Sequence, residues 1–188
     1  MAITTEMVRA LRDATGAGIM DSKRALEEAG GNVDKAKEVL RQQGLAKAGK
    51  KSDRSALQGV VEPYIHGGGR IGALVEINCE TDFVARTPDF QSLAHDVAMQ
   101  VAAIPPRWVS VDDVPEDAIA GLEKEFGSKE EAFKQVVLLE QTFIKDAKKT
   151  IQDLVKEGIA KLGENIVVRR FSRFELGESQ SAGAEAEA

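Results

Sequence analysis

The chain has 188 residues, of which 43% are hydrophobic and 30% charged, a composition that excludes a fully disordered protein and suits one domain with a small appendage. Its net charge of -6 argues against direct nucleic-acid binding, which needs a concentrated cationic face. No apolar run reaches the roughly 18 to 20 residues of a membrane-spanning helix, and the first residues lack a secretory pattern. The single cysteine, Cys79, cannot form an intrachain disulfide, so we expect a cytoplasmic protein that does not act on a membrane.

Residues 1–43 predict a small head of three short helices. Gly16 and Gly18 separate the first two helices, Asn32 can cap the third, and Gly44 is expected to end it. The glycine turn lacks the lysine of a phosphate-binding loop, so a plain helix–helix turn is the favoured interpretation. About forty residues lie near the lower limit for a stable core. The head also contains no histidine or cysteine, and we expect it to dock on another protein.

Residues 44–56 are rich in small and polar side chains and predict a linker, in part helical. Basic residues outnumber acidic ones around it, whereas residues 112–131 are strongly acidic. A solvated surface is the favoured interpretation of both stretches. For the linker, contact with acidic parts of a partner is the alternative.

Residues 57–176 predict an α+β core with a small antiparallel sheet. Strands are expected at 59–66 and 71–79, joined by a glycine-rich hairpin turn. Pro63 indicates that the first strand is an edge strand or contains a bulge, because proline cannot donate to a strand ladder. The glycines fit the G-x-G-x-x-G pattern of dinucleotide-binding proteins, but a strand follows them where that pattern needs a helix, so we favour a turn.

The clearest helix of the chain begins after Thr87, a good N-cap, with Pro88 at the first helical position. Its apolar residues repeat at helical spacing, and the run ends at Ile104 before two prolines. Beyond it we expect a helix from the capping box at Ser128 to about Leu139, a break or extended connection over 140–146, and a helix from 151 to 162. A strand over 165–174 and a solvated tail, 177–188, are expected to follow.

Catalytic and metal-binding chemistry is sparse in this sequence. His66, His95 and Cys79 show no metal-ligand spacing, and no hydrolase, protease or nucleotide-binding motif is present. We therefore expect no metal, no cofactor and no enzymatic reaction, and we interpret the chain as a protein that works by binding.

The segment Thr81–Val84, which we expect to be a loop, is the strongest candidate for a binding site, because it joins the most apolar predicted strand to the clearest helix. Two interpretations of Phe83 remain open. Composition favours a ring packed into its own core, since phenylalanine is usually buried. In the alternative, Asp82 and Phe83 project as a wedge, with the ring in an apolar slot of a partner and the carboxylate beside a polar group.

Three stretches of the chain resemble the bacterial elongation factor Ts family. They are residues 7–26 (MVRALRDATGAGIMDSKRAL), the core segments HGGGRIG at 66–72 and NCETDFVAR at 78–86, and GENIVVRRF at 163–171. Together they extend over nearly the whole chain apart from the tail, in the family's order. The family usually has proline where Thr142 stands.

The resemblance implies a guanine-nucleotide exchange factor for elongation factor Tu, a GTPase. The head would be a ubiquitin-associated-like domain that contacts the GTPase through Arg12, Ile19 and Met20. His66 matches a core position implicated in holding the partner. The segment that disturbs the partner's magnesium site corresponds to Thr81, Asp82, Phe83 and Val84.

The chain resembles the short members of the family, which carry one copy of the core unit. In such members two cores pair through their sheets, so the resemblance also implies a homodimer. Two other functions are weighed against nucleotide exchange: a ubiquitin-associated-like adaptor without exchange activity and, as a distant third, a small enzyme. Faster loss of GDP from the GTPase would distinguish the first from the second.

Overall fold

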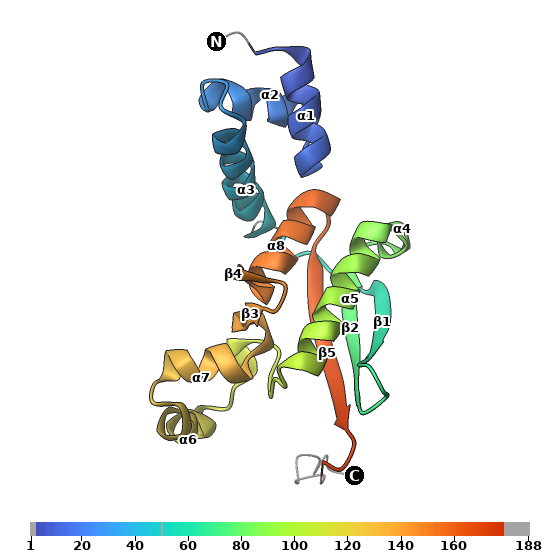
Figure 1. The fold of residues 1–188 in the computed structure, drawn as a ribbon, viewed down its shortest axis with the longest axis vertical. Coiled ribbons are helices and arrows are strands. Elements are labelled where there is room, and N and C mark those ends of the chain that lie inside the picture. Colours follow the sequence, from blue (N-terminus) through green and yellow to red (C-terminus); the bar gives the residue numbers. More distant parts are fainter. Residues whose placement is uncertain (1–2, 50, 179–188) are drawn as a thin grey trace.

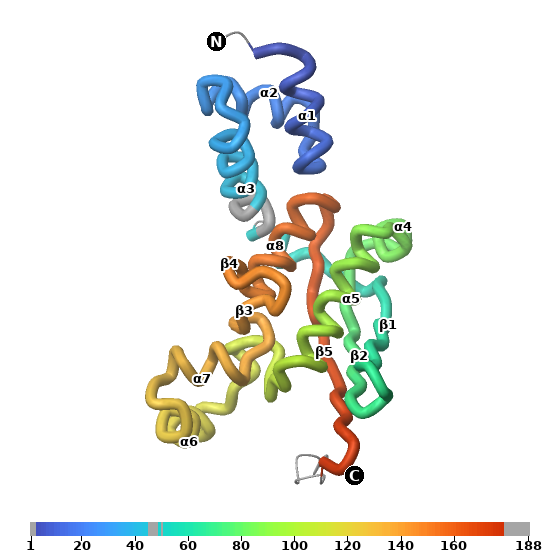
Figure 2. The backbone as a smooth tube through the Cα atoms, viewed as in Figure 1, coloured from blue at the N-terminus to red at the C-terminus, as the bar shows by residue number. Residues whose placement is uncertain are grey.

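The computed structural model describes residues 3–49 and 51–178, and the side chains of all of these except residues 45–48. The molecule is elongated: a helical head lies at one end, a sheet with two long helices in the middle, and a pair of short helices towards the other end (Figure 1). The backbone trace shows that the first helix and the end of the last strand lie far apart (Figure 2). From residue 179 onward, the predicted tail is outside the described residues.

The head contains the three predicted helices, α1 (Thr5–Thr15), α2 (Ile19–Glu28) and α3 (Val33–Gly49). The Thr4 side chain caps α1 by accepting from the Met7 amide, and Gly16 ends it in the left-handed conformation, with φ 69°. These helices enclose a small apolar cluster built from Val8, Leu11, Ala25, Leu26 and Ala36.

The third helix does not end at Gly44, as expected, but continues to Gly49. The physical reason is tertiary contact, because a Cβ atom at position 44 would lie 2.8 Å from the Cβ of Ala160 in the core. Glycine stands here to allow a close approach and does not break the helix. The first part of the expected linker, 44–56, is therefore helical.

A three-stranded antiparallel sheet forms the centre of the core, with the order β1 (Gln58–Ile65), β2 (Ile71–Cys79) and β5 (Ile166–Glu175). All three predicted strands are confirmed, to within one residue at each end. The strand that contains Pro63 lies at an edge of the sheet, one of the two predicted arrangements, with Pro63 opposite Leu74.

Two helices cover one face of this sheet: α5 (Pro88–Ala103) and α8 (Ile151–Leu162). Thr87 caps α5 by accepting from the Phe90 amide, as the Thr87–Pro88 pair predicted. The helices and the sheet bury one continuous core, in which the largest fully buried apolar side chains are Phe90, Ile77, Leu138 and Ile151. This arrangement confirms the predicted α+β class.

The remaining elements are short: α4 (Asp82–Ala85), η1 (Val111–Asp113), α6 (Glu116–Phe126), α7 (Lys129–Val136), η2 (Leu138–Glu140), β3 (Thr142–Phe143) and β4 (Asp146–Thr150). Ser128 caps α7 as predicted, but the helix ends three residues before Leu139. The acidic stretch 112–131 contains α6, which we did not predict, and α6 packs on α7 around Leu122 and Val136. The expected extended connection is a 3-10 turn followed by a two-stranded ribbon.

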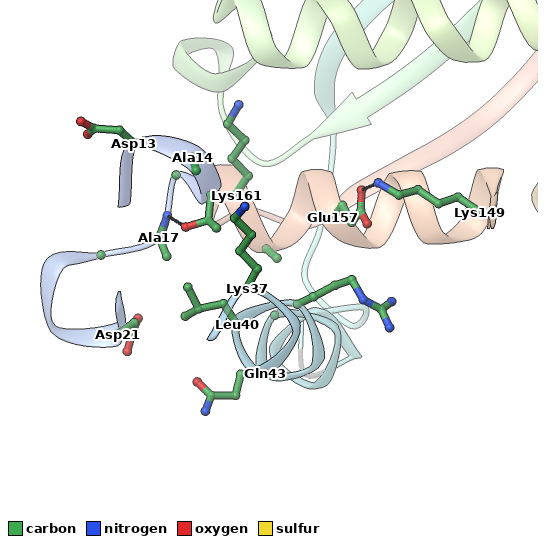
Figure 3. Close-up of a pocket in the computed structure, with 16 residues that line it drawn as sticks. Asp13, Ala14, Ala17, Asp21, Lys37, Leu40, Gln43, Lys149, Glu157 and Lys161 are labelled. Atoms are coloured by element: carbon green, nitrogen blue, oxygen red, sulfur yellow. Dashed lines mark hydrogen bonds and ion pairs between the residues drawn. The ribbon is translucent and has the colours of Figure 1, made fainter. Parts of the chain in front are cut away.

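The head contacts the core where α3 lies along α8 (Figure 1). Between them is a cleft of about 610 Å³. In the close-up, Lys37 and Leu40 line it on the side of the head, and Lys161 and Glu157 line it on the side of the core (Figure 3). Among the described residues, no helix combines the length and apolar character needed to cross a bilayer.

Candidate partner-binding corner and head surface

The segment Thr81–Val84 forms the start of α4, a single helical turn between β2 and α5. Thr81 is its N-cap: the hydroxyl accepts from the Val84 amide at 3.3 Å. Asp82 forms an ion pair with Arg86 at 2.9 Å, across the same turn. Asp82 and Phe83 are thus presented by a helical turn rather than by the loop that we expected.

Phe83 projects from this turn into solvent, with 84% of its surface exposed. Ala85, two residues on, is buried, and Val84 packs against the main core. Side chains two residues apart on a helix differ by about 200° in direction around the helix axis. Because Ala85 points into the core, Phe83 points outward. Of the two interpretations of Phe83, the packed ring is therefore wrong, and the ring lies on the surface.

The N-terminus of α4 is held by the loop that follows α8. The Glu164 carboxylate accepts from the Glu80 amide at 3.1 Å, the Thr81 amide at 3.0 Å and the Thr81 hydroxyl at 2.6 Å. In return, the Glu80 carboxylate accepts from the Asn165 amide at 2.7 Å. The Asn165 side chain donates to the carbonyl oxygens of Ser52 and Arg54, at 3.2 and 2.7 Å. One loop thereby joins the α4 corner to the chain that leaves the head.

Cys79 lies beneath this corner, at the end of β2, and is fully buried, as expected for a strand residue. Its thiol donates to the carbonyl oxygen of Thr81 at 3.1 Å. Burial raises the pKa of the Cys79 thiol, and the neighbouring negative charge of Glu164 acts in the same direction. The thiol is therefore held in its protonated, unreactive form at neutral pH.

The expected head contacts lie around the turn between α1 and α2. Ile19 and Met20, at the start of α2, are adjacent large apolar side chains that are 60% and 65% exposed. Arg12 is also exposed, in the last turn of α1, with Asp13 at 3.7 Å. The fold thus places these three residues at one end of the head.

This turn and the α4 corner lie at the same end of the core. A Cβ atom at Gly16 would be 3.3 Å from the Lys161 side chain, at the end of α8. Lys161 in turn pairs with Asp89 at 2.7 Å, in the first turn of α5 directly after the corner. Lys161, which the sequence analysis did not single out, therefore lies between the two candidate surfaces.

His66 lies apart from these surfaces. It is exposed at the turn between β1 and β2, with its Nδ1 atom 3.3 Å from the Tyr64 hydroxyl. The corner follows the other end of β2, and a strand of nine residues spans about 26 Å. The fold therefore does not bring His66 together with Thr81–Val84.

The face of the sheet that α5 and α8 do not cover carries a group of exposed apolar side chains. Its large side chains are Val61, Ile65, Leu74, Phe174 and Leu176, a set that we call the outer face. They lie in adjacent rows, because Gly72 stands opposite both Ile65 and Phe174, and Leu74 stands opposite Pro63. A groove of about 420 Å³ is lined by four of them, all except Val61. Exposed apolar patches of this kind mark protein interfaces.

The described residues contain no group of three or more histidine, cysteine or acidic side chains arranged to hold a metal ion. His95 is half exposed, and its Nδ1 atom lies 3.1 Å from a Glu62 carboxylate oxygen. The cleft between head and core has a mixed lining in which Lys149 pairs with Glu157 at 2.7 Å. These features leave the exposed corner, the head turn and the outer face as the surfaces most suited to binding.

The fold and these surfaces define a class, an α+β protein in which a three-helix head precedes a core that presents an aromatic corner. A family model described as Elongation factor TS matches residues 19–131 and 126–178. The Elongation factor Ts of Carboxydothermus hydrogenoformans is 56% identical over 196 residues, covering 94% of this chain and 90% of the relative. That of Coprothermobacter proteolyticus is 51% identical over 198 residues, covering 95% and 100%. The chain belongs to the elongation factor Ts family, as its motifs predicted.

Proposed function

We propose that this protein is a guanine-nucleotide exchange factor for elongation factor Tu, and that it acts in the cytoplasm during translation elongation. It would bind the GDP-loaded GTPase, disturb the magnesium and phosphate site, and stabilise the empty state until GTP binds. The observation that carries the proposal is the exposed Phe83 ring on a turn fixed between β2 and α5. Membership of the family supports the choice of partner.

The physical basis of exchange is thermodynamic linkage. Bound GDP is held through its phosphates and a magnesium ion. A wedge that fits only the distorted pocket stabilises the empty GTPase, so by reciprocity factor binding weakens GDP binding by the same factor. No bond is made or broken and no cofactor is needed. In this proposal Thr81 and Val84 hold the turn, while Asp82 and Phe83 enter the partner.

Stopped-flow release of a fluorescent GDP analogue from elongation factor Tu tests this proposal. We expect the protein to accelerate release, and Phe83→Ala to slow the stimulated rate on the order of 10²-fold if the ring contributes about 2 to 4 kcal/mol. Ile144→Ala is the matched control, because Ile144 is an exposed apolar residue in the β3–β4 turn, remote from the corner. Binding without faster release would instead identify an adaptor, and release unaffected by Phe83→Ala would reject the wedge.

We also propose that the head is ubiquitin-associated-like and docks on the GTPase through Arg12, Ile19 and Met20, while His66 contacts the partner at a separate point. Exposure of the two apolar side chains supports this role. The double variant Ile19→Ser/Met20→Ser is expected to raise the factor concentration that gives half-maximal release and to leave the maximal rate unchanged. A lower maximal rate at an unchanged half-maximal concentration would contradict a docking role.

The division into head (1–43), linker (44–56), core (57–176) and tail (177–188) remains a proposal, with the helix α3 extending into the linker. We further propose that two cores pair through their outer faces to form a homodimer. The adjacent apolar rows of that face support this pairing. Leu74→Glu is expected to halve the mass measured by light scattering, and a monomeric unmodified protein would refute the dimer.

A further inference from the structure

We propose that Glu164 is a positioning residue for nucleotide exchange, whose carboxylate fixes the start of α4 and thereby the direction in which Phe83 projects. The inference rests on the proposed function, since it assigns a supporting residue to the same corner. Glu164 itself lies outside the exposed turn and acts through Thr81, to which it is hydrogen-bonded.

The contacts of Glu164 occupy both carboxylate oxygens. Oε2 accepts from the backbone amides of Glu80 and Thr81, at 3.1 and 3.0 Å, and Oε1 accepts from the Thr81 hydroxyl at 2.6 Å. Bonds from neutral donors to an ionised carboxylate are stronger than bonds between neutral groups. Three such bonds join the Glu164 carboxylate to the consecutive residues Glu80 and Thr81, and together they restrain the position and the orientation of the backbone where α4 begins.

This restraint matters because α4 has only four residues. A helix of that length is far too short to form by itself in water, so its geometry must come from tertiary contacts. Val84 and Ala85 anchor its far side in the core, and Glu164 holds its near side. The exposed Phe83 lies between these two attachments and contributes little to holding itself in place.

The loop that carries Glu164 is itself fixed. Gly163 ends α8 in the left-handed conformation, with φ 80°, and turns the chain towards the corner. Asn165 donates its amide to the Glu80 carboxylate and its side chain to the carbonyl oxygens of Ser52 and Arg54. Glu164 thus accepts from the backbone of Glu80 and Thr81, and Glu80 accepts from the backbone of Asn165, the residue after Glu164, so the corner can move only if several hydrogen bonds break together.

Two conservative substitutions separate geometry from charge. Glu164→Gln retains an oxygen for the two amides and can donate its own NH₂ to the Thr81 hydroxyl oxygen, so it keeps the restraint without the charge. Glu164→Asp keeps the charge but is one methylene shorter and cannot reach all three donors. A positioning role therefore predicts that glutamine preserves exchange and aspartate impairs it. A direct charge contact with the partner predicts the opposite order.

The test is stopped-flow release of a fluorescent GDP analogue from elongation factor Tu, measured over a range of factor concentrations. We expect Glu164→Asp and Glu164→Ala to lower the maximal release rate about tenfold, corresponding to about 1.4 kcal/mol in the barrier, with an unchanged half-maximal concentration. Glu164→Gln should stay within about threefold of the original protein. Glu125→Ala is the matched control, since Glu125 lies on α6, away from the corner, and its carboxylate likewise accepts two hydrogen bonds, from Arg107.

A second comparison tests whether Glu164 acts through Phe83. In a Phe83→Ala background, Glu164→Asp should cause no further loss, whereas a general structural role would lower the rate again by the same factor. If Phe83→Ala slows release but Glu164→Asp does not, the positioning role is overturned and the proposed function stands. If Phe83→Ala itself has no effect, the wedge is rejected and the inference falls with it.

Discussion

Replacing Gly44 by alanine would test the contact that joins the head to the core. Gly44 lies inside α3, and a Cβ atom there would be 2.8 Å from the Cβ of Ala160 on α8. Carbon atoms pack best about 3.5 to 4.0 Å apart, so the two helices would have to separate by roughly 1 Å.

Two opposing effects set the size of the change in stability. Alanine is better than glycine in a helix interior by about 1 kcal/mol, whereas overpacking costs about 1 to 3 kcal/mol. We therefore expect Gly44→Ala to lower the free energy of unfolding by between zero and about 2 kcal/mol. Ala160→Gly alone should cost about 1 kcal/mol. In the double variant the overlap is removed and the two helix propensities offset each other, so its stability should return close to the original.

Chemical denaturation of the four proteins, followed by far-UV circular dichroism, gives the coupling between the two sites. We expect a coupling free energy of about 1 to 3 kcal/mol in favour of the double variant. Gly121→Ala in α6 is the control, because its Cβ would meet nothing within 4 Å and only the propensity gain remains. Additivity within about 0.5 kcal/mol would show that α3 does not rest on α8 at this point in solution.

The core offers three further tests. Phe90→Ala is expected to lower the free energy of unfolding by about 3 to 5 kcal/mol, because the ring is fully buried. Phe83→Ala should change it by less than about 0.5 kcal/mol. Equal losses of stability on denaturation would contradict the exposed position of Phe83. Gly59→Ala should cost at least about 3 kcal/mol in the same assay, since its Cβ would lie 2.1 Å from the carbonyl oxygen of Ile77 at φ 149°; a variant as stable as the original would refute this close approach. Because burial raises the pKa of the Cys79 thiol, DTNB at pH 8 should modify the folded protein on the order of 100-fold more slowly than the urea-unfolded chain, and equal rates would place the thiol on the surface.

The elements that the sequence predicted well are those whose pattern is local. The repeat along α5 and its Thr87–Pro88 start depend on residues within a few turns of one another, and so do β2 and the adjacent hairpin turn. The end of α3 depends instead on Ala160, more than a hundred residues further along the chain, and no local pattern could show that Gly44 packs against it. For α6, a helical spacing was present in Ile119, Leu122 and Phe126, but the surrounding acidic residues favoured a solvated stretch.

The candidate site divides in the same way. The position of Thr81–Val84 between a strand and a helix was readable from the sequence, whereas the direction of Phe83 depends on the helical turn that buries Ala85. Glu164 stood in the sequence only as part of the motif at 163–171, and its contact with the corner could not be read locally, because the amides and hydroxyl that it accepts from lie 83 and 84 residues away. Motif similarity identified the segment, but only the fold reveals what supports it.

The single hydrogen of the Thr81 hydroxyl has a consequence for what this position can tolerate. That hydrogen points to Glu164, and a lone pair is left for the Val84 amide, so one oxygen serves as donor and acceptor at once. Valine has nearly the same shape, yet it would leave both the Glu164 Oε1 atom and the Val84 amide without the hydrogen bond that the hydroxyl makes to each. Serine keeps both roles with one methyl fewer. Position 81 therefore requires a side chain that can donate one hydrogen bond and accept another, and this requirement restricts substitution more than side-chain size does.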